Sequence, residues 1–330
     1  MGAFGPFDWW GHLRAPAAGF PQAPPPTRGC RYSGILESDL DCDRLDYLRR
    51  TAHHSGLPYG NVDIDYLIDQ AALDQKDQFC YSYKALRAAD HLLVSRYFDY
   101  LQVPYHKSVV ALEWSLRVLI RELLERGEIA CRTRDMRAKV DKGEWTHFDD
   151  GHIFTRAGKL AQALRKKSAE RDIGVTKHIE AVLHRVPASL VASYESVGSK
   201  KDRSEIHEGT IETALADYRR KKGLCDLALH LWKPKDFALI KASTRTADAM
   251  DVSQDEPEYK EYVHIRDLEG GRAQPIFKYH HSLMWSIHKH RYRAHRIYAM
   301  TGGNQTFIDD LKTTLQPQLR ALGMRVSILS

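Results

Sequence analysis

The segment SDLDCDRLDYLRRTAHHSGLPYG (38–60) is dense in carboxylate, guanidinium and imidazole side chains. If this segment is a helix, four of its polar residues lie at positions i, i+4, i+7 and i+11 and so share one face: Asp43, Tyr47, Arg50 and His54. A carboxylate on such a stripe can hold a cation, while a guanidinium takes phosphate oxygens in a bidentate fork. The spacing indicates a metal-bridged phosphate site, with a solvated face of weak ion pairs as the alternative.

Two further stretches carry side chains that bind metals or anions. THFDDGHIF (146–154) is either a metal-binding loop or a polar turn in which Asp149 or Asp150 caps the next helix. KYHHSLMWSIHKHRYRAHR (278–296) has five histidines interleaved with basic and aromatic residues. It suits nucleic acid or a nucleotide, with a solvated basic face as the alternative. If a polyanion binds there, we expect three arginines to hold it: Arg291, Arg293 and Arg296.

The elements that must position these side chains are mainly helical from residue 36 to about 200. Leu45, Leu48 and Ala52 fall on one helix face. Two longer amphipathic patterns predict helices over 83–102 and 108–127, the second with Leu116 on its apolar side, and 157–186 continues the helical character.

Two residues punctuate this helical region. Pro104 marks a break between the first two of the long helices, and Gly127 suits the C-cap of the second. Beyond residue 201, short runs rich in Ile, Val, Tyr and Phe predict strands, and 305–322 predicts a closing helix. We therefore expect a mostly α fold with a smaller C-terminal α+β region.

This pattern divides the chain into three parts. Residues 1–30 are rich in Pro, Gly and Ala and predict a disordered arm. A helical domain is expected over 31–200 and an α+β region over 201–330.

Composition narrows the class of protein. The chain has 330 residues, 43% of them hydrophobic, which is enough for a packed core. Its net charge of +6 fits a polyanionic ligand but is ordinary for this length. The five cysteines are scattered without C-x-x-C spacing and predict reduced thiols, and no apolar run approaches a membrane span. The first thirty residues do not read as a secretory signal, so we expect a cytoplasmic protein without membrane association.

The segment 38–60 resembles a signature of HD-superfamily metal-dependent phosphohydrolases, D-x-D-R-x-D-Y-x-x-R-D-x-x-x-x-G-x-x-Y-G. The closest branch is the deoxynucleoside triphosphate triphosphohydrolases, which include the dGTPases. SRYFDYLQVPYHKSV (95–109) is similar to a second block of that branch, R-Y-x-M-Y-x-x-V-Y-x-H-K, and RIYAM (296–300) to a late strand. The resemblance implies an HD-type helical bundle and metal-dependent hydrolysis of a (deoxy)nucleoside triphosphate.

The resemblance also implies roles for particular residues. Asp43 matches the last metal ligand of the family's H…HD…D set. Residues matching the nucleotide pocket and the phosphate- and sugar-facing groups are Arg44, Tyr47, Arg50, Arg96, His106 and Lys107. A divalent cation (Mn, Mg, Fe or Zn), a nucleoside triphosphate partner and a homo-oligomer are the corresponding expectations.

The sequence departs from the family pattern in its metal ligands. His12 is the only histidine before Asp43, and no His-Asp dipeptide occurs in the chain. Thr51 replaces an aspartate of the family, and Pro104 stands in place of a tyrosine. We therefore assign no catalytic residue and predict that the chain as written is inactive.

Four explanations of this departure stay open: a true start upstream of Met1, a pseudoenzyme, ligands from a partner chain, or a different site built by other histidines. The competing function is a non-catalytic nucleotide- or nucleic-acid-binding protein.

Overall fold

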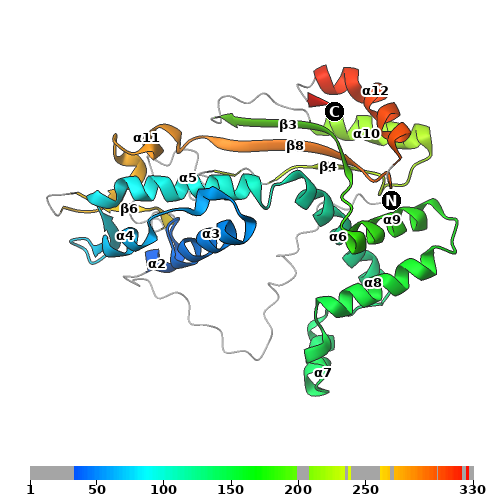
Figure 1. The fold of residues 1–330 in the computed structure, drawn as a ribbon, viewed down its shortest axis with the longest axis horizontal. Coiled ribbons are helices and arrows are strands. Elements are labelled where there is room, and N and C mark those ends of the chain that lie inside the picture. Colours follow the sequence, from blue (N-terminus) through cyan, green and yellow to red (C-terminus); the bar gives the residue numbers. More distant parts are fainter. Residues whose placement is uncertain are drawn as a thin grey trace.

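The computed structural model describes residues 33–198, 208–234, 237–238, 261–267, 271–302, 304–321 and 325–326. The predicted N-terminal arm lies outside these residues. Within them the chain is mostly helical, with strands gathered in two sheets (Figure 1), which confirms the predicted fold class. None of the described helices is both long and apolar enough to cross a membrane.

The N-terminal part places two helices around a small sheet. The helix α3 packs against α5. The strands β1 and β2, which come between these two helices in the sequence, form an antiparallel hairpin. The elements in chain order are α2 (Ser33–Glu37), α3 (Cys42–Ser55), η1 (Pro58–Gly60), α4 (Ile64–Asp69), β1 (Ala71–Leu73), β2 (Phe79–Ser82), η2 (Tyr83–Ala85) and α5 (Leu86–Gln102).

The middle of the chain is a helical layer that ends in a projecting helix. The helix α6 packs against α9 and α8, while α7 lies at the far tip of this layer (Figure 1). As predicted, the chain breaks around Pro104, and Gly127 follows α6 with a φ of 71°. These helices are α6 (Lys107–Glu125), α7 (Thr133–Asp141), η3 (Trp145–His147), α8 (Asp150–Leu164) and α9 (Glu170–His184).

The C-terminal part contributes strands to both sheets. The larger sheet has the order β4-β8-β3-β9, with β5 also paired to β8, and the smaller has the order β1-β2-β6-β7. The elements of this C-terminal part are β3 (Ser189–Gly198), α10 (Glu208–Lys222), β4 (Leu229–Trp232), β5 (Phe237–Ala238), β6 (His264–Arg266), β7 (Gln274–Pro275), η8 (Ile276–Lys278), α11 (Leu283–Ile287), β8 (Arg291–Ala299), α12 (Gln305–Ala321) and β9 (Arg325–Val326).

The smaller sheet joins parts of the chain that are distant in sequence. The strand β2 pairs in parallel with β6, so that Tyr81 lies opposite Ile265 and Ser82 opposite Arg266. The predicted boundary near residue 200 stays a prediction, but sheet pairing crosses it.

Three local predictions differ from the structure. The helical character predicted over 157–186 is divided between two helices, since α8 ends at Leu164 and α9 begins at Glu170. The predicted helical region also contains β1, β2 and β3, and β3 was missed because its buried apolar residues, Val191 and Ala192, are adjacent and do not alternate with polar ones. The side chain of Leu116, expected on the apolar face of α6, is 40% exposed, because that face centres on Val110, Trp114 and Val118.

Candidate functional site

The helix α3 forms where the sequence predicts it. The Asp41 side chain caps its first turn by accepting a hydrogen bond from the Arg44 N–H at 2.8 Å. Gly56 ends the helix with a φ of 69°. Leu45, Leu48 and Ala52 are buried against the core, which confirms the predicted apolar face.

The turn after α3 approaches the helix so closely that it requires glycine. A Cβ atom added at Gly60 would lie 2.2 Å from the Cβ of Ala52 and 3.0 Å from the carbonyl oxygen of Leu48. This close packing holds η1, and with it Tyr59, against the helix.

A buried polar group lies where α5 packs against α3 and the residues before it. Arg96 on α5 donates from Nη1 to the Asp39 carboxylate at 2.8 Å, and the two side chains are 6% and 0% exposed. The guanidinium also lies over the rings of Tyr100 and Phe237, 5.8 and 5.7 Å from their centroids. The Nε atom of Arg96 is buried without a hydrogen-bond partner among the described residues.

Two tyrosines complete this group, which we call the inner cluster (Asp39, Tyr47, Tyr59, Arg96 and Asp99). Burial raises the pKa of Tyr47 to about 12, although the nearby Arg96 charge opposes the rise. The Tyr59 hydroxyl donates to Asp99 at 2.6 Å. Burial also raises the pKa of Asp99 above its ordinary value, against the hydrogen bond from Tyr59 and the charge of Arg96.

Arg44 lies at the edge of the inner cluster but is engaged locally. Its Nη1 atom donates to the Ser38 carbonyl oxygen at 2.5 Å and also bonds the carboxylate of Asp41. Arg44 therefore orders the chain ahead of α3, and its side chain is only 13% exposed.

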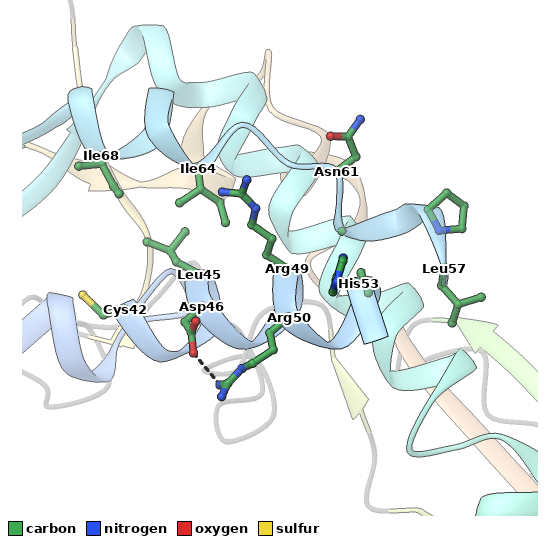
Figure 2. Close-up of a pocket in the computed structure, with 13 residues that line it drawn as sticks. Cys42, Leu45, Asp46, Arg49, Arg50, His53, Leu57, Asn61, Ile64 and Ile68 are labelled. Atoms are coloured by element: carbon green, nitrogen blue, oxygen red, sulfur yellow. Dashed lines mark hydrogen bonds and ion pairs between the residues drawn. The ribbon is translucent and has the colours of Figure 1, made fainter. Parts of the chain in front are cut away.

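The adjacent face of α3 opens into a groove of about 750 Å³, which we call the outer groove. Arg50 and Asp46 form an exposed ion pair at 2.6 Å on its rim (Figure 2). Its walls come from α3, η1 and α4: Cys42, Leu45, Asp46, Arg49, Arg50, Ala52, His53, Leu57, Pro58, Gly60, Asn61, Ile64 and Ile68. No local sequence pattern predicts this groove, because its far wall depends on where α4 packs.

The predicted site residues therefore fall in three places. Tyr47 and Arg96 share the inner cluster, with Arg44 beside it, whereas Arg50 lines the outer groove. His106 and Lys107 lie at the joint between α5 and α6. There His106 caps α6, accepting from the Ser108 N–H at 3.4 Å, and the Lys107 carbonyl oxygen accepts from the Tyr298 hydroxyl at 3.1 Å.

The described residues do not fit a divalent metal centre. Asp43 lies in the first turn of α3 and is exposed. No group of three or more His, Cys, Asp or Glu side chains that could hold an ion is found in the described part of the chain. In the stretch 146–154, Asp149 caps α8 by accepting from the His152 N–H at 2.9 Å, which confirms the polar turn.

Two arginines at the C-terminal end of the basic stretch 278–296 are built into the fold. Arg291 and Arg296 are buried on β8, and Arg296 bonds the Glu195 carboxylate and the Tyr105 carbonyl oxygen while lying over Trp232. The guanidinium of Arg296 therefore links the larger sheet to the joint between α5 and α6.

Parts of the chain are similar in sequence to curated proteins. The uncharacterized protein YwfO of Bacillus subtilis is 26% identical over 150 residues, which are 44% of this chain and 30% of that protein. The uncharacterized protein MJ1154 of Methanocaldococcus jannaschii is 31% identical over 96 residues, 28% of this chain and 21% of the relative. The chain thus spans less than a third of the curated relatives it matches. No protein-family model matches it.

Solved structures share the fold more broadly. A phosphohydrolase from Bacteroides thetaiotaomicron superposes with a TM-score of 0.52 at 16% identity, covering 81% of this chain and 63% of that one. A hypothetical protein from Aquifex aeolicus gives a TM-score of 0.55 at 19% identity, with 86% and 60% covered. The chain therefore has a fold found in a phosphohydrolase.

Proposed function

We propose that this chain is an HD-type, dGTPase-like phosphohydrolase homologue that binds a (deoxy)nucleoside triphosphate. The resemblance of 38–60 and 95–109 to that branch supports the substrate class, and the fold shared with a phosphohydrolase supports the chemistry. The structure brings both segments together, since α3 packs against α5 around the Asp39–Arg96 pair.

One observation carries the nucleotide assignment. The Nε–H of Arg96 is a buried donor without an acceptor among the described residues, at the place where the resemblance puts a phosphate-facing arginine. Buried donors are nearly always satisfied, so an oxygen of a bound phosphate would complete this one. Tyr47, next to Arg96, keeps its proton at neutral pH because burial raises its pKa, and can therefore donate to the same anion.

Hydrolysis by this chain alone is not part of the proposal. The family's metal would supply an activated water and neutralise phosphate charge. Of the four ligands that the family uses, only Asp43 has a counterpart here, and it is exposed with no clustered partners in the described ranges. Nucleotide binding without turnover is accordingly the expected behaviour, and a non-catalytic nucleic-acid-binding protein is the alternative.

The experiment measures dGTP and dATP affinity by calorimetry with and without Mn²⁺, and triphosphate release under the same conditions. We expect micromolar binding, weakened about tenfold by Arg50→Ala and by Arg96→Lys. Arg220→Ala on α10 is the control for Arg50→Ala, because it removes another exposed guanidinium that pairs with an acid on its own helix. Absence of nucleotide binding would refute the proposal, whereas Mn²⁺-dependent turnover lost in Asp43→Ala would refute the expected inactivity.

A further inference from the structure

The outer groove is an apolar surface that opens on the outside of α3 and α4. Its apolar lining includes Leu45 of α3, Leu57 beside η1, and Ile64 and Ile68 of α4. Ile68 is 58% exposed and lies at the same end of the groove as Cys42 (Figure 2). Apolar side chains that are grouped on a surface mark an interface with another molecule, whereas isolated ones are ordinary.

On the α3 wall of this groove, one arginine has no acidic partner. The ion pair of this wall joins Arg50 to Asp46, one turn apart, and Arg49 pairs with none of the residues that the structure describes. Figure 2 shows the Arg49 side chain extending from α3 toward Ile64, which lies on the opposite wall. The charge of Arg49 is therefore beside the apolar residues and is free to pair with a carboxylate of another molecule.

On the α4 wall, the exposed charges are acidic. Asp65 and Asp69 each follow a groove-lining isoleucine by one residue, and both are exposed. Successive residues are about 100° apart around a helix axis, so these carboxylates lie at the outer edge of the wall. Neither of them forms an ion pair within the described ranges. One apolar groove thus has an unpaired cation on one wall and unpaired acids on the other.

We propose that the outer groove is the interface through which two copies of this chain associate, with α3 of each copy packed across α4 of the other. In a two-fold arrangement every contact is made twice, so the basic wall of each copy meets the acidic wall of its partner. Ile68 of each copy enters the groove of the other, near Leu45 and Ile64. An apolar centre with a charged rim is the usual anatomy of such an interface.

Other occupants match this surface less well. A strongly acidic partner would meet Asp65 and Asp69, and a strongly basic one would meet Arg49, while like charges across an interface are costly. A small apolar molecule inside the groove would leave most of the exposed part of Ile68 in water. A second copy satisfies both signs of charge, because each copy supplies the wall that the other needs.

Sedimentation equilibrium of the full chain, without nucleotide and from about 1 to about 100 µM, tests this interface independently of the proposed function. We expect a monomer–dimer equilibrium with a micromolar dissociation constant, because the groove offers only a small area. Ile68→Asp should weaken association at least about tenfold, since it buries a charge at the centre of the contact. Val140→Asp on α7 is the matched control, because Val140 is also 58% exposed on a helix, and should leave association unchanged.

Exchanging the charges of the two walls tests the pairing itself. Arg49→Glu should weaken association at least about tenfold, and so should Asp65→Lys/Asp69→Lys, because each change places like charges opposite one another. The chain with all three substitutions has opposite signs again and should recover the parent dissociation constant to within about threefold. Circular dichroism and the unfolding midpoint establish that each variant is folded.

Cysteine labelling gives a second measurement on the parent chain. Cys42 lines the groove and is exposed, whereas Cys131 is exposed outside it. Reaction of Cys42 with iodoacetamide, followed by peptide mass spectrometry, should slow as the dimer forms, while Cys131 should react at a constant rate. The proposal is overturned if the chain stays monomeric at the highest concentration, if Ile68→Asp and Val140→Asp act equally, or if the combined charge variant does not recover.

Discussion

The two sides of α3 differ in how the charges beside them are held. In the inner cluster, Arg96 and Asp39 are almost fully buried, and the Arg96 guanidinium also lies over the rings of Tyr100 and Phe237. In the outer groove, Arg50 and Asp46 are 59% and 66% exposed and meet only across one helical turn. The same residue types are therefore held in a buried network on one side of α3 and exposed on the other.

The largest expected effect comes from breaking the buried pair. Arg96→Ala would leave the Asp39 carboxylate buried without that cation, which typically destabilises a protein by about 3–5 kcal/mol. Urea unfolding should show a loss of this size. A change below about 1 kcal/mol would mean that the inner cluster is as loosely held as the outer groove.

Removing a hydrogen bond within the inner cluster should have a smaller effect. Tyr59→Phe deletes the hydroxyl that donates to Asp99 and leaves this buried carboxylate less satisfied, at about 1–3 kcal/mol. Tyr66→Phe is the matched control, because that hydroxyl bonds at 3.3 Å on the surface and should be nearly neutral. Equal effects of the two variants would contradict the comparison.

The stability contributed by the inner cluster should also depend on pH, through Asp99. Because the pKa of Asp99 is raised in the folded state, the folded chain binds its proton more tightly than the unfolded chain does. The contribution of Asp99 to stability is therefore greatest below its unfolded pKa and is lost as pH rises through the folded value. Asp99→Asn still accepts the hydrogen bond from Tyr59. Its free energy of unfolding, relative to that of the parent, should be higher at pH 7 than at pH 4.

Unfolding free energies at the two pH values measure this change. A difference between variant and parent that is constant with pH, or that has the opposite sign, would show that Asp99 is not shielded from water.

The smallest stability effect is expected on the exposed rim. Arg50→Ala removes an ion pair between neighbouring turns that is worth less than about 0.5 kcal/mol. The unfolding midpoint should be unchanged within error even though nucleotide affinity falls. A large loss of stability would place Arg50 with the buried arginines.

Local sequence signals predicted much of the fold. Asp149 caps α8 and Gly127 follows α6, as the sequence predicts, because capping depends on residues within one turn. The residue pattern of α12 likewise predicted its helix.

The site depended on contacts that no local pattern encodes. Arg96 and Asp39 are far apart in sequence, and nothing near either residue indicates that one neutralises the other. The outer groove needs α4 beside α3, and the burial of Arg291 and Arg296 needs β8 at the centre of a sheet. The residue types therefore indicated which side chains could bind an anion or a metal, whereas the tertiary packing determined which of those side chains are exposed.

The parallel pairing of β2 with β6 has a consequence for how the chain folds. During synthesis β2 emerges long before β6. The edge of β2 that pairs with β6 therefore has no partner until β6 has been made. Pairing of segments so distant in sequence is slow, because a long loop must close first. A truncated chain ending near residue 200 would keep β2 as an open edge, and such edges recruit other strands into aggregates.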